Sequence, residues 1–354
     1  MPLFRRHGEH PAESDAFQLL ARLAEAKDIH LSDPTASESL LTAATEVLFA
    51  ARAPHRLYGQ RAEEMFRYVV AGIGAARAIK GEDAGDVLAD DKEELSTPDF
   101  RIVLLNGEEL LVEVKNFNDS SGMKPFRCSE RYLGRLARYG KLFNRPIYLA
   151  IYWFAWRQWT LHSIEDLLSI VENGRLKLRF VDALPRSEMR VLGDFSIGTK
   201  YPLSLRLLVD AELLAQHEKE SEYKMVITGV ELRCAGTQLI SARDKEIAYG
   251  LMVHGRWHEA EPEVITNDEI VNAIEFVFAP EEPHEGQGFE IVASVSTLMS
   301  SYFDHLTVDK HGVRRLHPGS LPESPYPRLN ENYRSEELPL WMFVLSPSAT
   351  PPRE

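Results

Sequence analysis

The sequence predicts a mixed α/β (α+β) fold, in which a core of helices and strands is followed by a β-rich C-terminal region. Three observations predict it. Residues 60–79 and 129–144 carry apolar side chains at helical spacing. Residues 99–115 form two short alternating runs on either side of an Asn-Gly pair, which is the strongest short-range signal for a β-hairpin. Residues 146–154 form a continuous apolar run, typical of a buried strand.

The composition is that of an ordinary globular protein with more than one domain. The chain has 354 residues, of which 44% are hydrophobic and 27% charged. This length exceeds the usual size of a single domain. We expect an N-terminal helical segment over residues 1–54, a central domain over 55–184, and a β-rich C-terminal domain of unknown role over 185–354.

Cysteine usage and charge narrow the class of protein. Cys128 and Cys234 are too few for a disulfide framework or a cysteine-rich zinc site, and they fit a reducing cytoplasm. The N-terminus lacks the apolar core of a signal peptide, and the longest apolar run, residues 146–156, is too short to cross a bilayer. We therefore expect a cytoplasmic protein without a membrane partner. The net charge of −14 argues against a nucleic-acid partner unless basic residues are clustered.

Three helices are expected before the hairpin. Residues 14–27 and 37–53 have helical patterns, and neither helix carries residues that suggest chemistry. The third helix, residues 60–79, has Glu63 and Glu64 in its first turns. Acids near a helix N-terminus interact favourably with the helix dipole, so both have an ordinary structural explanation.

The hairpin can pair in two registers. A two-residue loop at the Asn-Gly pair would place Phe100 opposite Glu113. The carboxylates of Asp99 and Glu113 would then point to opposite faces of the sheet. A three-residue loop with Gly107 in a left-handed conformation shifts every pair by one, so that Asp99 faces Glu113.

The apolar pattern chooses between these registers. In the shifted register one face is entirely apolar, with Phe100, Ile102, Leu104, Leu110, Val112 and Val114. The other face carries the charges, with Asp99, Arg101, Val103, Glu109, Leu111, Glu113 and Lys115. We therefore predict the shifted, bulged register, which gathers Asp99, Glu113 and Lys115 on one face. Two carboxylates and an amine on rigid strands are what a magnesium-dependent phosphodiesterase needs.

The sign of the charge reverses after the hairpin. Residues 82–94 are strongly acidic and are expected to form a solvated connection, with a metal-site role for Asp86 or Asp90 as the alternative. Between residues 121 and 145, Glu130 is the only acid. The basic residues of this stretch are Lys124, Arg127, Arg131, Arg135, Arg138, Lys141 and Arg145.

The helix expected at residues 129–144 separates apolar from basic side chains. Its apolar stripe consists of Tyr132, Leu136, Tyr139 and Phe143. Arg131, Arg135 and Arg138 form a second, basic stripe. A solvated helix face usually mixes both signs, so this stripe indicates phosphate contacts. The predicted nucleic-acid-binding residues are Arg127, Arg131, Arg135, Arg138 and Lys141.

The next strand and its surroundings are rich in aromatic residues. Some could stack on bases, although core packing is the expected role for most of them: Tyr148, Tyr152, Trp153, Trp156 and Trp159. Ser163 begins a capping box for a helix that is expected to end near Gly174.

The second half of the chain predicts mainly strands. The strand-like runs are Leu176–Asp182, Lys224–Cys234, Glu246–Val253, Ala273–Phe278 and Leu338–Leu345. Residues 292–305 predict a helix, or a strand that leads into one. His254 and His258 are four apart, but the glycines around them argue against a helix and hence against a metal site there.

The order of these elements resembles the PD-(D/E)XK nuclease superfamily, which has the restriction-endonuclease-like fold. The resemblance rests on Pro98-Asp99 in the first hairpin strand and Glu113-Val114-Lys115 in the second, after a helix containing Ala62-Glu63-Glu64-Met65-Phe66. It covers residues 55–160, under a third of the chain. It implies a nuclease-like domain at residues 55–184 with a mixed central sheet flanked by helices.

The resemblance also implies roles for individual residues. Asp99 and Glu113 would bind Mg²⁺ or Mn²⁺, together with the backbone carbonyl of Val114. Lys115 would position or activate the attacking water and offset charge on the phosphate. Close to two carboxylates, this lysine should stay protonated, which suits a charge stabiliser more than a general base.

A further carboxylate would come from the helix before the hairpin. Glu63 is the expected residue, with Glu64 as the alternative. The function expected from the full set of residues is a metal-dependent nuclease, of the endonuclease type, with DNA as the expected substrate. A homodimer is one assembly that this protein could form. The alternative is a catalytically inactive nucleic-acid-binding or protein-interaction protein that retains the fold. DNA against RNA, strandedness, sequence specificity and one or two metals stay open.

Overall fold

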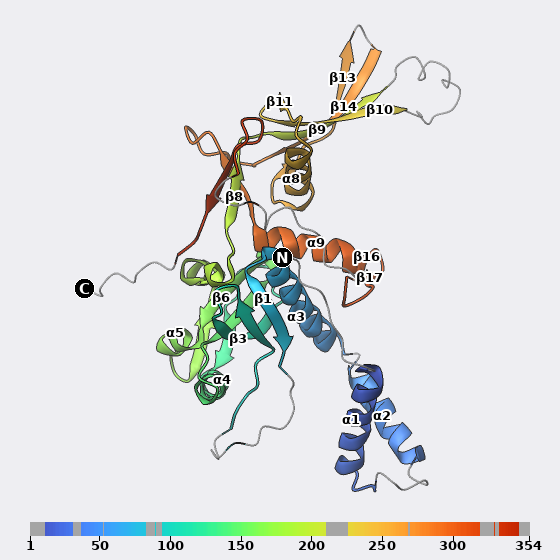
Figure 1. The fold of residues 1–354 in the computed structure, drawn as a ribbon, viewed down its shortest axis with the longest axis vertical. Helices are drawn as coiled ribbons and strands as arrows, with labels where there is room; N and C mark the ends of the chain where they lie inside the picture. Colours follow the sequence, from blue (N-terminus) through green and yellow to red (C-terminus); the bar gives the residue numbers. More distant parts are fainter. Residues whose placement is uncertain are drawn as a thin grey trace, which may run out of the picture.

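The computed structural model describes residues 11–30, 37–51, 53–82, 89, 94–209, 226–267, 270–318, 329 and 333–346. Its helices are α1 (Pro11–Ala26), α2 (Ser37–Ala51), α3 (Pro54–Ile73), α4 (Glu130–Leu142), α5 (Ile164–Ser169), α6 (Phe180–Ala183), α8 (Ala242–His254) and α9 (Val295–Thr307). The acidic residues Asp86 and Asp90 lie outside the described residues. The two helices predicted at the N-terminus are confirmed as α1 and α2, which pack against each other away from the central sheet (Figure 1).

A five-stranded mixed sheet forms the centre of the molecule. Its order is β1-β2-β3-β5-β6, and the strands are β1 (Ala76–Gly81), β2 (Phe100–Leu104), β3 (Glu109–Phe117), β5 (Ile147–Trp153) and β6 (Gln158–Ser163). β3 and β5 are parallel, whereas the other neighbours are antiparallel. Helices cover both faces of this sheet, so the predicted mixed α/β fold is confirmed (Figure 1).

The β2–β3 hairpin has the predicted bulged register. Phe100 pairs with Val112 and Val103 with Glu109, so every pair is shifted from the two-residue-loop register. Gly107 has a φ of 88°, the left-handed conformation that glycine adopts without a steric penalty, and its N–H donates to the carbonyl of Leu104 at 3.0 Å. The side chains of Asp99 and Glu113 therefore lie on the same side of the hairpin.

Each face of the sheet is buried in its own apolar cluster. On one face Phe100, Ile102 and Val112 pack with residues of α3 and α9. On the other face Leu111 is fully buried with Leu133 and other residues of α4. On the charged face predicted for the hairpin, Glu113 is thus buried under a helix, whereas the Glu109 side chain stays 30% exposed.

α3 begins and ends earlier than predicted. It starts at Pro54, which is pre-shaped for the first turn, and ends at Gly74, whose φ of 85° stops the helix. The helix predicted to continue to residue 79 is wrong there, because residues 76–81 form β1. Small residues such as Ala76 fit both the helical and the strand periodicity. The pairing of Ile79 with Ile102 on β2 favours the strand.

The elements after the hairpin follow the prediction closely. The helix and strand predicted at residues 129–144 and 146–154 are confirmed as α4 and β5. The Ser163 side chain accepts a hydrogen bond from the backbone N–H of Asp166, so Ser163 caps the helix as predicted. Its own N–H, however, donates to Glu188, so the reciprocal half of the capping box is not formed. The short helix α5 ends at Ser169, before the predicted end near Gly174.

The second half contains two further sheets. One has three strands, in the order β15 (Glu290–Ser294), β8 (Ser196–Thr199) and β18 (Leu340–Phe343). The other has six: β11 (Thr237–Gln238), β10 (Ile227–Cys234), β9 (Leu203–Val209), β14 (Ile270–Ala279), β12 (His258–Glu259) and β13 (Glu263–Asn267). Two small pairs are β4 (Phe126–Ser129) with β7 (Arg175–Leu178), and β16 (Val308–Asp309) with β17 (Gly312–Val313). The short turns are η1 (Phe154–Trp156), η2 (Leu184–Arg186) and η3 (Met189–Leu192).

Two predictions for this half have opposite outcomes. The strand predicted at residues 246–253 is wrong, because the segment belongs to α8, which is capped by Ser241. Ile247, Ala248 and Leu251 are fully buried on one face of the helix. Their separations of one, three and four residues are typical of a helix, not of a strand. A strand leading into a helix at residues 292–305 is confirmed as β15 and α9.

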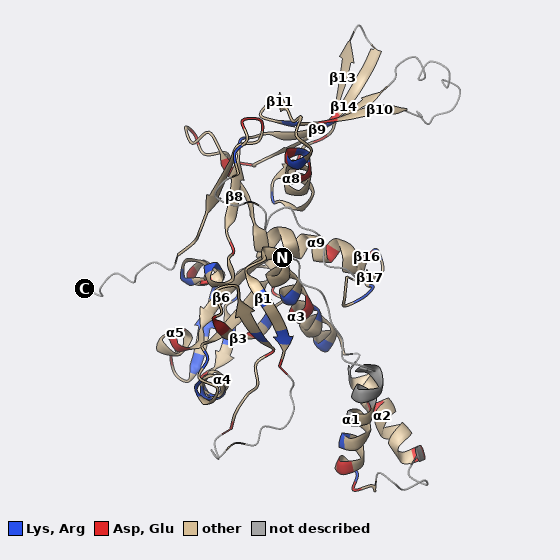
Figure 2. Cartoon of the chain, viewed as in Figure 1, with Lys and Arg blue, Asp and Glu red and all other residues tan. Residues whose placement is uncertain are grey.

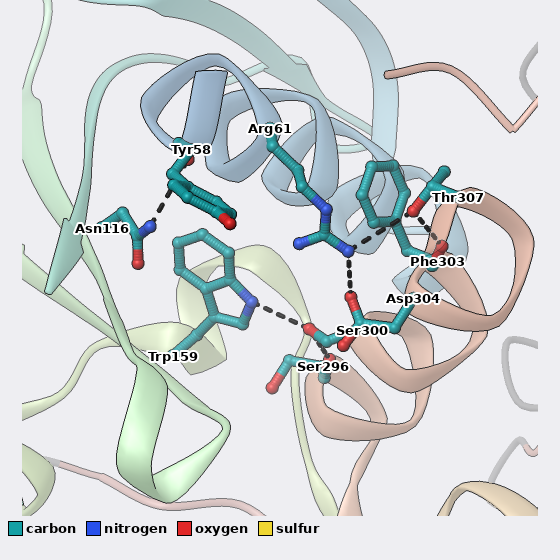
Figure 3. A network of polar contacts seen from close by, with 9 residues as sticks. All are labelled: Tyr58, Arg61, Asn116, Trp159, Ser296, Ser300, Phe303, Asp304 and Thr307. Carbon is teal, nitrogen blue, oxygen red and sulfur yellow. Dashed lines mark hydrogen bonds and ion pairs between the residues drawn. The ribbon is translucent and has the colours of Figure 1, made fainter. Parts of the chain in front are cut away.

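α9 joins the second half to the central sheet. Arg61 of α3 forms an ion pair of 2.5 Å with Asp304 of α9 (Figure 3). The buried indole N–H of Trp159 on β6 donates to the hydroxyl of Ser300 on α9 at 3.0 Å (Figure 3). One apolar cluster contains residues of α3 and α9 alike, such as Phe66 and Phe303. The domain boundary near residue 185 stays a prediction. Among the described residues, none of the helices combines the length and apolar composition needed to cross a bilayer.

Candidate active site

The site lies where the β2–β3 ladder ends. Proline has no backbone N–H, so Pro98 cannot donate to β3. The Asp99 side chain instead provides an acceptor here, and its Oδ2 accepts the backbone N–H of Val114 at 2.7 Å. Val114 itself is buried and pairs with Ala150 of β5. The Pro-Asp dipeptide thus ends the ladder and fixes the Asp99 carboxylate beside β3.

Glu113 is held by two donors. Only 3% of this residue is exposed. Its Oε1 accepts hydrogen bonds from the ammonium of Lys115 and, at 2.5 Å, from the hydroxyl of Tyr132 on α4. The Lys115 ammonium also lies 5.2 Å from the centre of the Tyr132 ring. This tyrosine was expected only as part of an apolar stripe, and it is the contact of the site that sequence reasoning missed.

The acids of the site repel one another's ionised forms. Burial and then the charge of Glu113 raise the pKa of Asp99 to about 7. Burial, followed by the charge of Glu113, also raises the pKa of Glu63 on α3. Asp99 and Glu63 are therefore close enough to sense the charge of Glu113, and their own carboxylates lack a direct cationic partner in the part of the chain that the structure describes.

Glu63 and Glu64 differ in their surroundings. Burial and then Glu113 raise the pKa of Glu63, and Lys115 opposes this shift, so its carboxylate senses the charges of the site. Glu64 instead forms an ion pair of 3.1 Å with Arg67, and His317 Nδ1 lies 2.9 Å from its carboxylate. These contacts favour Glu63 as the acid that α3 contributes.

Lys115 is held in its charged form. Burial lowers its pKa, but the Glu113 carboxylate and the Tyr132 hydroxyl together outweigh this effect, and the net shift is upward. A protonated lysine cannot accept a proton from water. Its position favours stabilisation of negative charge over general-base chemistry.

The donor set suits a hard divalent cation in its chemistry. Mg²⁺ and Mn²⁺ prefer carboxylate oxygens, and Asp99, Glu113 and Glu63 supply them in a site where their negative charges are poorly compensated. The positions of these side chains do not yet form a metal site. Within the described part of the chain, no three His, Cys, Asp or Glu side chains converge as ligands. Glu113 Oε1 is engaged by Lys115 and Tyr132, and a cation would take the place of the Lys115 ammonium there.

The basic stripe of α4 lies beside this site, and Figure 2 shows basic residues along α4. Arg131 and Arg135 both contact the carboxylate of Glu94, at 2.5 and 3.2 Å. Arg138 donates to the backbone carbonyl of Glu94 at 3.1 and 2.9 Å. We call Arg131, Arg135 and Arg138 the α4 arginine surface. Residue 94 was expected to belong to a solvated connection, and its contact with α4 was not foreseen.

The other predicted nucleic-acid-binding residues flank the α4 arginine surface. Arg127 lies on β4 and Lys141 in the last turn of α4, and both are exposed. Arg145 is occupied by an ion pair of 2.9 Å with Glu109. Arg127 and Lys141 thus extend the positive surface at its two ends.

Most of the aromatic residues considered for base stacking belong to the core. Trp153 and Trp159 are fully buried, and Tyr152 is nearly so. Trp156 is 42% exposed, but its ring stacks on Phe180 at 4.8 Å. His258 lies on a strand, but His254 is the last residue of α8, so the expectation that this segment is not helical is wrong for His254.

No protein-family model and no curated protein matches this chain. Among solved structures, it is similar to Hjc, a Holliday junction resolvase from the archaeal hyperthermophile Archaeoglobus fulgidus, at 17% sequence identity and a TM-score of 0.22. The similarity covers 30% of this chain and 77% of that chain.

Proposed function

We propose that this protein is a metal-dependent nuclease of the PD-(D/E)XK type that hydrolyses phosphodiester bonds, with DNA as the expected substrate. The observation that carries the proposal is the end of the β2–β3 ladder. There Asp99 and Glu113 lie on one face with a protonated Lys115, in the register that the apolar pattern requires. Phosphodiester hydrolysis needs this combination of oxygen ligands and a fixed cation.

Asp99 and Glu113 would hold Mg²⁺ or Mn²⁺, with the Val114 carbonyl and Glu63 as further oxygen donors. When bound, such a cation stabilises charge on the phosphate and makes a water more acidic. The ammonium of Lys115 would move from Glu113 toward a phosphate oxygen and offset the charge that develops there. The Tyr132 hydroxyl would keep Glu113 oriented while Lys115 moves.

The α4 arginine surface, together with Arg127 and Lys141, would bind the phosphate backbone beside the site. Contacts of this kind position the duplex and carry no sequence information. They also reconcile a nucleic-acid partner with the net charge of −14, because the basic residues are clustered on one element.

The test is a cleavage panel with Mg²⁺ or Mn²⁺ on single- and double-stranded DNA and RNA. Wild type should cleave at least one substrate, and a chelator should stop it. Lys115→Ala and Asp99→Ala should both lose cleavage by about 100-fold or more, since each removes a charge from the reacting centre. Cleavage that persists equally in both variants would sink the assignment of the site. Asp182→Asn, a change at an exposed ion pair with Arg179, is the control.

A second candidate function is a nucleic-acid-binding protein that keeps the fold without catalysis. It is favoured by one observation: Glu113 is already engaged by Lys115 and Tyr132, and the described residues hold no converged set of three ligands. This function predicts salt-sensitive binding through α4 and no cleavage with any divalent cation.

A further inference from the structure

We infer that the Glu94 carboxylate lies where a phosphate of the nucleic acid binds, so that binding displaces Glu94 from the α4 arginine surface. The ligand is a phosphodiester, and Glu94 is its competitor within the chain. The inference rests on the nucleic-acid binding proposed above, but it is independent of cleavage.

The geometry is that of an anion site. One carboxylate bridges two guanidinium groups, with 2.5 Å to Arg131 and 3.2 Å to Arg135. Guanidinium groups bind carboxylate and phosphate oxygens with similar geometry, because both anions present two oxygens to the planar donors. Arg138 donates to the backbone carbonyl of Glu94 and completes the site.

Glu94 is ionised and only weakly held. Hydrogen bonds from Arg131 and then Arg135 lower the pKa of its carboxyl, so it carries its charge at neutral pH. Its side chain is 54% exposed and that of Arg131 is 74% exposed. Exposed ion pairs of this kind contribute little to stability, because water and salt screen them. A nucleic acid, with several phosphates in a row, can therefore displace a single carboxylate.

The anion site formed by Arg131 and Arg135 is linked to the candidate catalytic residues. The Arg135 guanidinium lies 5.6 Å from the centre of the Tyr132 ring, and the Tyr132 hydroxyl bonds to Glu113. Glu94 stands five residues before Asp99, and the intervening backbone is tied to α4 by the Ser96 N–H, which donates to the carbonyl of Arg135 at 3.4 Å. The arginine site and the candidate active site are therefore linked through Tyr132 and through the segment that leads into Asp99.

The test measures binding of a short fluorescently labelled DNA duplex of mixed sequence, with a chelator present so that nothing is cleaved. Glu94→Gln keeps the size of the side chain and the backbone carbonyl but loses the charge. We expect it to bind the duplex about two- to fivefold more tightly than wild type, as expected for release of one exposed ion-pair network. Glu246→Gln, an exposed charge on α8, makes the same change in net charge away from the site and should leave affinity unchanged.

A second pair of variants separates displacement from a general charge effect. In an Arg131→Gln/Arg135→Gln background, Glu94→Gln should no longer improve binding, because the guanidinium groups that Glu94 occupies are gone. A gain that persists in this background, or that equals the gain in Glu246→Gln, would overturn the inference. If wild type binds the duplex and Glu94→Gln does not bind it more tightly, the inference fails and the proposed nucleic-acid binding stands. If wild type neither binds nor cleaves any nucleic acid, both fail.

Discussion

The hydroxyl of Tyr132 donates a hydrogen bond of 2.5 Å to the carboxylate of Glu113, from a helix to the middle of a buried strand. Tyr132 thereby fixes the carboxylate that is expected to bind the metal, while its ring lies against the ammonium of Lys115. The contact links α4, which carries the basic residues, to the strand that carries the reacting groups.

Tyr132→Phe should reduce cleavage by about tenfold, because it keeps the ring beside Lys115 but loses the bond that orients Glu113. The concentration of Mg²⁺ needed for half-maximal cleavage should rise as well. Both are measured in single-turnover reactions over a Mg²⁺ titration. Tyr139→Phe is the matched control, since this tyrosine lies on the same helix and bonds to Glu82 at 3.1 Å instead. Equal losses in the two variants would argue against a role at the site.

Asp99→Asn should abolish cleavage yet stabilise the fold in the presence of a chelator. The folded-state pKa of Asp99 is about 7, above the value near 3.9 of an unfolded chain, so its ionised form is disfavoured by folding. The contribution of Asp99 to the unfolding free energy of wild type should therefore fall as pH rises from about 4 to 7. Asn carries no charge and can still accept the Val114 N–H.

At pH 8 we expect Asp99→Asn to be roughly 1–3 kcal/mol more stable than wild type in chemical denaturation with a chelator. Adding Mg²⁺ should raise the melting temperature of wild type and not that of Asp99→Asn, because a ligand stabilises only the state that binds it. A variant less stable than wild type at pH 8 would contradict the assigned like-charge repulsion.

Replacing Arg131, Arg135 or Arg138 by Gln should weaken binding of unrelated DNA sequences to the same extent. Each lost phosphate contact should reduce the slope of log affinity against log salt by about one. The measurement is a titration of labelled duplex at several salt concentrations. Arg179→Gln, at an exposed pair with Asp182, should leave the slope unchanged. Unchanged slopes for the α4 variants would favour a protein-interaction role for this helix.

His162 should make the fold sensitive to acid. The residue is 2% exposed, its Nε2 has no hydrogen-bond partner among the described residues, and burial, followed by the charge of Arg186, lowers its pKa to about 4. Unfolding raises this value to about 6.5. The contribution of His162 to the unfolding free energy should thus be fully present above pH 6.5 and fall by roughly 3 kcal/mol as pH drops to 4. The contribution of Asp99 changes in the opposite direction over this range, so each is read as the difference between wild type and its own variant.

His162→Gln should lose this part of the pH dependence, as measured by urea denaturation at several pH values. His311→Gln, at an exposed turn, is the control and should keep the wild-type profile. An identical slope in His162→Gln and wild type would show that other groups cause the acid sensitivity.

The hairpin and the helix that follows it could be predicted from the sequence because their signals are local. Alternation of apolar residues and the glycine at position 107 determine a register, and the register places Asp99 opposite Glu113. The period of α4 separates its buried residues from its arginines. These features need only one apolar face to be buried and the other to face water, and they do not depend on which element packs against the apolar face.

Contacts between distant segments were decided only by the tertiary structure. Nothing in the sequence around Tyr132 shows that its hydroxyl reaches Glu113, since a tyrosine on an apolar stripe can pack without a specific partner. The pairing of Glu94 with Arg131 and Arg135 joins residues about 40 positions apart. The helix predicted to continue to residue 79 gave way to β1 because an edge of the sheet was available to pair with it.

The sequence by itself determined the hairpin register and hence which charged groups share a face. The tertiary structure decided which of those groups are buried and which partners hold each one. It also decided that Glu94 occupies the arginines of α4. The physical reason is that periodicity reports only the division between apolar and polar sides of one element. A carboxylate's partners, its pKa and its access to a phosphate depend on the elements that fold over it.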